Sequence, residues 1–302
     1  SKSLQPGEPG TTGFQILLYR KTGPRMSFHQ IPIGRYLVTG GAGFIGSHVT
    51  EQLLEQGSEV IVVDNFITGR RENIRVFLGN RRFSLVEQDL VKPLKVDGAI
   101  SGIFHLASPA SPVDYARFPI ETLHVGALGS DNVLKLTMEK MCSVLVASTS
   151  EVYGDPLEHP QKETYWGYVN PVGPRGCYDE SKRYLEALTM AYRRVHGIKS
   201  HIVRIFNTYG PRMRTNDGRV VPNFCIQALA NQDLTVYGDG RQTRSFCYVD
   251  DLVDGLFRAI GSGYCEPINL GNPVELSILE FAEKIIGLSG AKIKIVFRPL
   301  PT

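Results

Sequence analysis

The sequence predicts an α/β fold in which helices cover both faces of a doubly wound parallel sheet. Within Arg35 to Gly46 a short apolar run meets four closely spaced glycines, and apolar residues then recur at helical spacing. A second apolar run ends at Asp64, and apolar runs continue to alternate with helical patterns along the chain. This alternation is typical of a Rossmann-type sheet built from strand–helix–strand units.

The glycines between the first strand and the first helix indicate a phosphate site. Gly40, Gly43 and Gly46 follow a GxxGxxG spacing. Such glycines allow a tight turn, a close approach of backbone N–H groups to a pyrophosphate, and close packing of the helix on the strand. The uncapped helix N-terminus then faces the anion. The sequence therefore predicts a bound dinucleotide.

Asp64 favours NAD over NADP, because its carboxylate accepts hydrogen bonds from an adenosine ribose and repels a 2′-phosphate. Arg70 and Arg71 lie close by in the sequence and leave NADP open. The other strand ends should line the same crevice, since ligands bind at the carboxyl ends of strands in such sheets. The predicted cofactor residues are Gly40, Gly43, Phe44, Ile45, Gly46, Asp64, Asn65, Asp89, Leu90, Leu106, Ala107, Ser108, Tyr178 and Lys182.

Composition narrows the class of protein. A chain of 302 residues with 42% hydrophobic content can bury a large core. The formal net charge of +3 and the scattered arginine pairs give little support to nucleic-acid binding. Five widely spaced cysteines without a CxxC pair indicate reduced thiols and a cytoplasmic location. No apolar run approaches the ~18 residues of a membrane span, so we expect no membrane partner.

Further elements follow from the hydrophobic periodicity. Helices are expected over 118–140, from about Cys177 to His196, over 220–230, and after a cap at Asp250. Additional strands are expected at 83–87, 102–106, 143–147, 200–204 and 234–237. The predicted domains are a flexible leader (1–33), an NAD-binding domain (34–200, with 201–212 and 245–262), and a smaller interwoven α/β substrate domain (mainly 213–302).

One helix carries a candidate catalytic pair. Tyr178 and Lys182 follow a long proline-rich loop and are four residues apart, so they share a helix face. An ammonium group beside a phenol lowers the pKa of the phenol by about 1–3 units, which brings the phenolate within reach of neutral pH. Tyr178 could then act as a base. The spacing alone is also compatible with an exposed pair that has no catalytic role.

These features together resemble the extended short-chain dehydrogenase/reductase family, whose members remodel nucleotide sugars. The resemblance combines the glycine turn, Asp64, a strand that ends in Thr149, and the Tyr178–Lys182 pair, and it runs from about Arg35 to Val296. Longer stretches are similar to the branch of that family that decarboxylates UDP-glucuronate; they begin at Asp64, His105, Ser148, Cys177, Arg204 and Thr243.

The resemblance implies a redox-neutral, metal-free carboxy-lyase that converts UDP-glucuronate to UDP-xylose through a 4-keto sugar. Tyr178 would remove the proton of the 4-hydroxyl while Thr149 holds the same oxygen. Glu151 would handle the C5 proton, and Arg244 would orient the departing carboxylate. The expected catalytic residues are Tyr178, Lys182, Thr149, Ser150, Glu151 and Arg244.

The resemblance also implies a substrate site and an assembly. A diphosphate and a carboxylate require planar, bidentate donors, which arginine supplies. We expect a homodimer in which the helices over 118–140 and 178–196 form a four-helix bundle with their copies. The expected substrate-binding residues are Asn207, Arg212, Arg219, Val220, Tyr237, Arg241 and Arg244.

Alternatives remain open at this point. Relatives usually carry lysines where this chain has Glu121 and His124 and an asparagine in place of Gly126, and they continue past Thr302. A UDP-glucuronate 4-epimerase, a nucleotide-sugar 4,6-dehydratase and a non-catalytic NAD-binding protein share the same outline. Ser150 before Glu151 favours decarboxylation, because dehydratases of the family need an acid at the first position and epimerases lack the glutamate.

Overall fold

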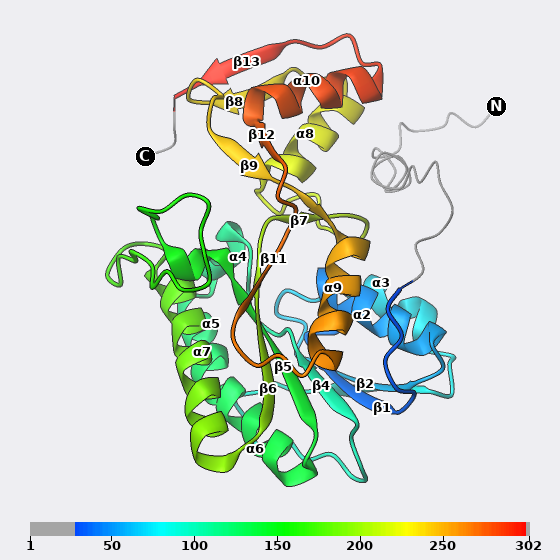
Figure 1. Cartoon of the computed structure of the whole chain (residues 1–302). Helices are drawn as coiled ribbons and strands as arrows, with labels where there is room; N and C mark the ends of the chain where they lie inside the picture. Colours follow the sequence, from blue (N-terminus) through cyan, green and yellow to red (C-terminus); the bar gives the residue numbers. More distant parts are fainter. Residues whose placement is uncertain (1–27, 300–302) are drawn as a thin grey trace, which may run out of the picture. The chain divides into compact units, whose positions relative to one another are not determined.

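The computed structural model describes residues 28–299, which form two compact units (Figure 1). The sheet unit comprises residues 28–208 and 247–271, and the small unit comprises residues 209–246 and 272–299. Each unit is therefore assembled from separate stretches of the chain. Most of the predicted leader, up to residue 27, lies outside the described residues.

Seven parallel strands form the core of the sheet unit, in the order β11-β6-β5-β4-β1-β2-β3. This confirms the predicted α/β class with a parallel sheet. The strand order reverses between β1 and β4, where such folds bind their ligands. The strands are β1 (Arg35–Thr39), β2 (Glu59–Asp64), β3 (Phe83–Glu87), β4 (Gly102–His105), β5 (Ser143–Thr149), β6 (Lys199–Ile205) and β11 (Ile268–Leu270).

Helices cover both faces of this sheet, because successive strand residues point to opposite sides. On β1, Val38 contributes to the apolar cluster under α2 (Phe44–Glu55) and α9 (Val249–Gly261). Its neighbour Leu37 contributes to the cluster under α6 (Ser130–Lys140) and α7 (Gly176–His196). Both side chains are fully buried, which explains the nearly continuous apolar runs of the strands.

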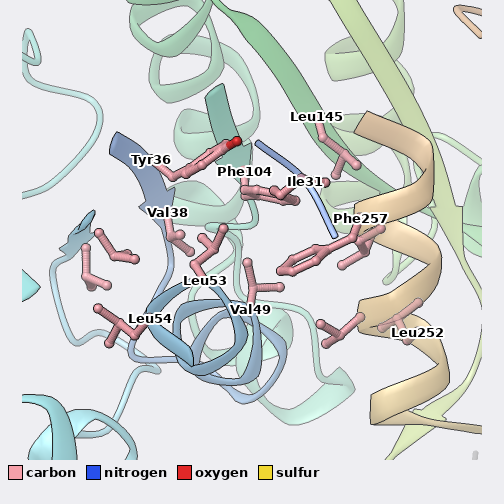
Figure 2. Close-up of a cluster of buried hydrophobic side chains, with 14 of the residues drawn as sticks. Ile31, Tyr36, Val38, Val49, Leu53, Leu54, Phe104, Leu145, Leu252 and Phe257 are labelled. Atoms are coloured by element: carbon pink, nitrogen blue, oxygen red, sulfur yellow. The ribbon is translucent and has the colours of Figure 1, made fainter. Parts of the chain in front are cut away.

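Figure 2 shows the first of these clusters, in which side chains from the sheet meet α2 and α9. The rings of Phe104 and Phe257 lie with their centroids 5.6 Å apart. Ile31, near the end of the predicted leader, is also buried here, and the backbone N–H of His29 donates to Asp254 Oδ1 on α9 at 2.6 Å. Residues 28–32 therefore belong to the packed structure.

The predicted helix over 118–140 is interrupted by one wider turn. It consists of α5 (Pro119–His124), a π-helical turn η2 (Val125–Gly129) and α6. A Cβ atom at Gly126 would lie 2.7 Å from Cβ of Ser181 on α7. The glycine thus permits a close approach of η2 to the helix that carries the candidate catalytic pair.

Asp250 does not cap α9, so this prediction was wrong. The helix begins at Val249, two residues earlier than a cap at Asp250 would place it, and its N-cap residue is Tyr248. Asp250 lies within the first turn together with Asp251, where negative charge interacts favourably with the helix dipole.

The small unit has its own apolar core. Helices α8 (Val220–Leu229) and α10 (Ile278–Ser289) contribute to it, and β8 (Leu234–Tyr237) pairs in parallel with β13 (Ile295–Arg298). A second pair is antiparallel and joins β9 (Thr243–Ser245) to β12 (Glu275–Ser277). The remaining elements of the chain are short: α3 (Arg71–Ile74), η1 (Arg75–Phe77), α4 (Pro112–Arg117), η3 (Ser150–Tyr153), β7 (Thr208–Tyr209) and β10 (Cys247–Tyr248).

The close approach at η2 gives a testable expectation. Gly126→Ala should destabilise the protein by about 1–3 kcal/mol, because the added methyl group collides with Ser181 and the two helices must separate. Gly287→Ala in α10 is the control, since a Cβ atom there meets nothing within 4 Å and alanine favours a helix. Thermal unfolding measures both variants, and equal midpoints would contradict the packing constraint.

Candidate active site

The glycine turn packs backbone against backbone. Gly40 has φ +70°, and a Cβ atom there would lie 2.8 Å from the backbone of Ala107, which follows β4. A Cβ atom at Gly46 would lie 2.1 Å from the carbonyl oxygen of Gly40. Gly43 is the N-cap of α2 and no side chain caps this helix, so the first-turn N–H groups remain for a ligand. The turn fits the pyrophosphate of a dinucleotide.

Asp64 ends β2 and is bonded to the same turn. One carboxylate oxygen accepts the backbone N–H of Ala42 at 2.9 Å, and the other accepts that of Phe66 at 2.8 Å. Burial raises the pKa of Asp64, whose exposed fraction is 8%, and these two bonds partly oppose the effect. Each carboxylate oxygen has a second lone pair, which leaves acceptor capacity for ribose hydroxyls.

The two arginines that left NADP open are both paired with carboxylates. Arg71 Nη2 lies 2.6 Å from Glu87, and its guanidinium lies over the ring of Phe66. Arg70 Nε lies 3.4 Å from Glu72. Each pairing reduces the positive charge offered to a 2′-phosphate. The paired arginines therefore favour NAD over NADP as the cofactor.

The segments that follow the other strands are held by a mixture of side-chain and backbone contacts. Asn65 donates to Asp89 Oδ2 at 3.1 Å, which links the segments after β2 and β3. The N–H of Leu106 donates to Thr39, and Ala107 contacts Gly40. Ser108 donates to the neighbouring carbonyl of Pro109, whereas the side chain of Leu90 is buried in the second apolar cluster.

Tyr178 and Lys182 are both buried on α7, beside the end of β5. Lys182 Nζ donates to the carbonyl oxygen of Ala147 at 2.8 Å and lies 5.9 Å from the centroid of the Tyr178 ring. Burial lowers the pKa of Lys182 to about 8. Ala147 is two residues before Thr149, so the helix pair and the predicted threonine meet at one strand end. The Lys182 ammonium favours a phenolate at Tyr178.

The turn after β5 supplies one carboxylate. Thr149 Oγ1 accepts the backbone N–H of Glu151 at 3.3 Å, and Ser150 begins the short helical turn η3. The carboxylate of Glu151 forms an ion pair with Arg175, the residue that precedes α7. Arg175 was not among the predicted site residues, because its partner lies 24 positions away in the sequence.

A second missed residue is Tyr115 on α4. Its ring stacks on that of Tyr178, with centroids 5.0 Å apart and planes at 11°. The helix start was visible in the sequence, because Ser111 accepts the N–H of Asp114 as N-cap and Pro112 occupies the first helical position. The stack holds the plane of the Tyr178 ring.

His105 lies close to this site, but both of its ring nitrogens are hydrogen-bonded to neighbouring side chains. Its Nδ1 contacts Thr39 Oγ1 at 2.8 Å, and its Nε2 contacts Ser130 Oγ at 3.0 Å. Burial and the charge of Lys182 lower the pKa of His105 to about 3. The imidazole is therefore neutral at physiological pH.

The predicted substrate residues fall mainly in the small unit. Arg219 precedes α8 and pairs with Asp217, with Nη2 and Oδ2 2.8 Å apart. Arg244 on β9 donates to the carbonyl oxygen of Thr243 at 2.7 Å, and Arg241 is exposed near Asp239. The small unit also contains Arg212, Val220 and Tyr237, whereas Asn207 belongs to the sheet unit. The sheet unit thus brings together Tyr178, Lys182, Thr149, Ser150 and Glu151, and Arg244 belongs to the other unit.

Residues 36–271 match the NAD dependent epimerase/dehydratase family. The chain belongs to this family. Membership of the NAD dependent epimerase/dehydratase family confirms the predicted cofactor.

The chain is also similar to individual members with named activities. UDP-glucuronic acid decarboxylase 1 of Xenopus tropicalis is 52% identical over 263 residues, which cover 87% of this chain and 62% of that protein. The chain thus spans about three fifths of this relative's length. UDP-glucose 4-epimerase from Thermotoga maritima, with UDP-glucose, has a TM-score of 0.79 at 29% identity and covers 89% and 86% of the two chains. UDP-glucuronic acid 4-epimerase from Bacillus cereus, in complex with NAD, has a TM-score of 0.75 at 28% identity, covering 88% and 87%.

The described residues 28–299 contain neither a candidate membrane-spanning helix nor a cluster of side chains that could hold a metal ion. Every helix there is too short or too polar to cross a bilayer. No group of three or more histidine, cysteine, aspartate or glutamate side chains in that range could hold a metal ion. All five cysteines fall within it and are unpaired.

The buried ammonium of Lys182 predicts a pH-dependent stability. Between pH 8 and pH 10.5 the unfolded chain holds this proton and the folded chain does not, so the contribution of Lys182 to stability rises with pH across the window. Relative to Lys182→Met, the wild type should gain about 3 kcal/mol. Chemical denaturation at several pH values measures the difference. Lys135→Met, which removes an exposed ammonium, is the control, and an equal gain there would contradict burial as the cause.

Proposed function

We propose that the protein is an enzyme that decarboxylates UDP-glucuronate to UDP-xylose with bound NAD. The observation that carries the proposal is the arrangement at the end of β5, where Tyr178 and Lys182 lie beside a turn that supplies a single carboxylate, Glu151. The 52% identity to a protein named UDP-glucuronic acid decarboxylase 1 supports it.

The chain's own groups first activate the sugar 4-hydroxyl. Tyr178 accepts its proton, the ammonium of Lys182 stabilises the phenolate, and the hydroxyl of Thr149 holds the same oxygen. When bound, NAD supplies the oxidation of C4 and the later reduction, so none is consumed overall. The site needs no other redox partner.

The carboxylate then leaves without metal assistance. The 4-ketone is β to the C6 carboxylate, so the electrons of the breaking C5–C6 bond move into an enolate at C4 and carbon dioxide departs. C5 then takes up a proton, which Glu151 or a water that it orders supplies. The Arg175 guanidinium holds the Glu151 carboxylate at the turn during this step.

The proposal extends to the UDP group and the substrate carboxylate. Arginine forks suit both anions, and Arg219 and Arg244 lie in segments that resemble substrate-binding motifs of the family. Arg244 would orient the departing carboxylate. The residues proposed to bind the substrate are Asn207, Arg212, Arg219, Val220, Tyr237, Arg241 and Arg244.

A product assay tests the reaction. Incubation with UDP-glucuronate and NAD should yield UDP-xylose and carbon dioxide in equal amounts, and UDP-glucose or dTDP-glucose should yield no 4-keto-6-deoxy sugar. A dehydratase must protonate a departing hydroxyl, and the serine hydroxyl of Ser150 is a poor acid. Formation of UDP-galacturonate without carbon dioxide would overturn the proposal and establish a 4-epimerase.

The Tyr178→Phe variant tests whether Tyr178 is the catalytic base. The variant should lose about three orders of magnitude or more in kcat and still bind NAD, because only the phenol oxygen is removed. Tyr184→Phe is the matched control, since it makes the same change on an exposed side chain of α7. Near-normal turnover by Tyr178→Phe would remove this residue from the mechanism.

We further propose that two copies associate through a four-helix bundle. The surfaces of α5, η2 and α7 expose apolar side chains that a monomer would leave in water: Ile120, Leu123, Leu128, Tyr184 and Val195. A symmetric pairing of this face would bury them.

Sedimentation at micromolar concentration should show a dimer, and Leu128→Glu should shift it to monomer by placing a charge in the bundle. Leu288→Glu, at an exposed position of α10 in the small unit, should leave the dimer intact. A monomeric wild type, or a Leu128→Glu variant that remains dimeric, would contradict the proposed interface.

A further inference from the structure

We propose that Arg204 and Glu186 form a positioning pair that holds the turn carrying Thr149 and Glu151 in place against Tyr178 and Lys182. Neither Arg204 nor Glu186 takes part in the chemistry outlined above. The inference rests on the proposed function, because it assigns these two residues a role in the same site.

The pair joins a strand to the catalytic helix. Arg204 on β6 donates through Nε to Glu186 Oε1 at 2.9 Å and through Nη2 to Oε2 at 2.7 Å. Their side chains are only 10% and 13% exposed. Glu186 lies one turn after Lys182 on α7, on the same face of the helix. A bidentate pair of this kind fixes both the distance and the orientation of its partners.

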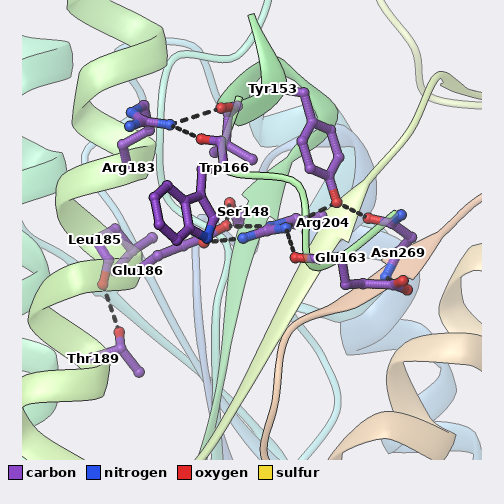
Figure 3. Close-up of polar contacts among 11 residues, drawn as sticks. Ser148, Tyr153, Glu163, Trp166, Arg183, Leu185, Glu186, Thr189, Arg204 and Asn269 are labelled. Carbon is purple, nitrogen blue, oxygen red and sulfur yellow. Dashed lines mark hydrogen bonds and ion pairs between the residues drawn. The ribbon is translucent and has the colours of Figure 1, made fainter. Parts of the chain in front are cut away.

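The same pair is bonded to both ends of the turn that follows β5. Ser148, directly before Thr149, donates its hydroxyl proton to Glu186 Oε1 at 2.5 Å. Tyr153, the last residue of η3, accepts a hydrogen bond from Arg204 Nη1 at 2.8 Å. Figure 3 shows these side chains meeting at Arg204. Because Thr149 and Glu151 lie between the two attachment points, their position relative to α7 depends on the pair.

A second set of bonds reaches the long loop before α7. The hydroxyl of Tyr153 donates to Asn269 Oδ1 at 2.6 Å, and Asn269 is the residue of β11 opposite Arg204. The carbonyl oxygen of Glu163 accepts from Arg204 Nη1 at 3.0 Å, and its carboxylate accepts the backbone N–H of Asn269 at 2.9 Å. This loop leads to Arg175, the partner of Glu151.

Fold stability alone is a poor reason for such a pair. Burying two charges requires their desolvation, and apolar side chains of similar volume in the same place are often as stable or more so. Those side chains could not bond Ser148, Tyr153 and the Glu163 carbonyl together. The guanidinium of Arg204 donates four hydrogen bonds at once: two to Glu186, one to Tyr153 and one to the Glu163 carbonyl oxygen. A lysine ammonium cannot reproduce this geometry.

The double variant Arg204→Met/Glu186→Met separates positioning from stability. It should unfold near the wild-type temperature and retain NAD, whereas kcat for carbon dioxide release should fall about 100-fold, because displacement of catalytic groups by about 1 Å has that effect. KM should change by less than about threefold. Arg193→Met is the matched control, since it removes a different paired arginine, which lies near the C-terminal end of α7, and it should keep full kcat.

Tyr153→Phe is a milder second variant, because it removes one hydroxyl from a fully buried ring and introduces no charge. It should lower kcat about tenfold, and amides of residues 148–154 should exchange hydrogen faster in both variants without substrate. Wild-type kcat in the double variant, or a loss no larger than its unfolded fraction, would overturn the inference. If the wild type itself releases no carbon dioxide, the proposed function fails, and unchanged amide exchange would then overturn the positioning role separately.

Discussion

Seven parallel strands place their carboxyl ends at one edge of the sheet, and the rest of the site depends on this constraint. The glycine turn follows β1, Asp64 ends β2, Ala107 follows β4, and Thr149 ends β5. A parallel sheet needs a crossover after each strand, so every strand end is also the start of a loop or helix that can carry function. The strand order reverses between β1 and β4, which is the place where sheets of this kind bind their ligands.

The pKa values of two buried cations at this edge, Lys182 and Arg204, are shifted in opposite directions. Lys182 is bonded to a carbonyl oxygen, and burial lowers its pKa to about 8. Arg204 is bonded to the carboxylate of Glu186; burial opposes its charge, but Glu186 and Tyr153 outweigh that effect and raise the pKa of the guanidinium. A cation with a carboxylate partner is a fixed structural element. A cation with only a neutral partner keeps its charge available for the phenol beside it, at a cost in stability.

Local patterns in the sequence were enough to predict the glycine turn and six of the seven strands of the large sheet, whereas β11, which has only three partly buried residues, was not predicted. Fully buried strands read as apolar runs, and the glycines are required by contacts within a few residues or with the adjacent strand. The π turn at Gly126 and the role of Arg175 depend on contacts between segments far apart in the chain, which periodicity does not encode. The Arg204 network was hidden for the same reason, since it joins β5, β6, α7 and β11.

The cap expected at Asp250 shows a different limit. Asp250 and Asp251 are both acceptable at a helix start, so the sequence could not fix which residue begins α9. The error shifts the start by two residues and leaves the buried face of the helix unchanged, because Val253, Leu256 and Phe257 still face the sheet. Apolar periodicity is therefore the more dependable signal for placing α9, and its capping residue is the less dependable one.

In the proposed reaction, bound NAD would oxidise C4 and later reduce it again, while the residues of this site would move the protons and promote loss of the carboxylate within one binding event. UDP-glucuronate labelled with deuterium at C4 tests this most directly, without added reduced cofactor. We expect the UDP-xylose formed to keep the deuterium at C4, because the same hydrogen that leaves in the oxidation returns in the reduction. Loss of the label to solvent, or a product that keeps its carboxylate, would contradict it.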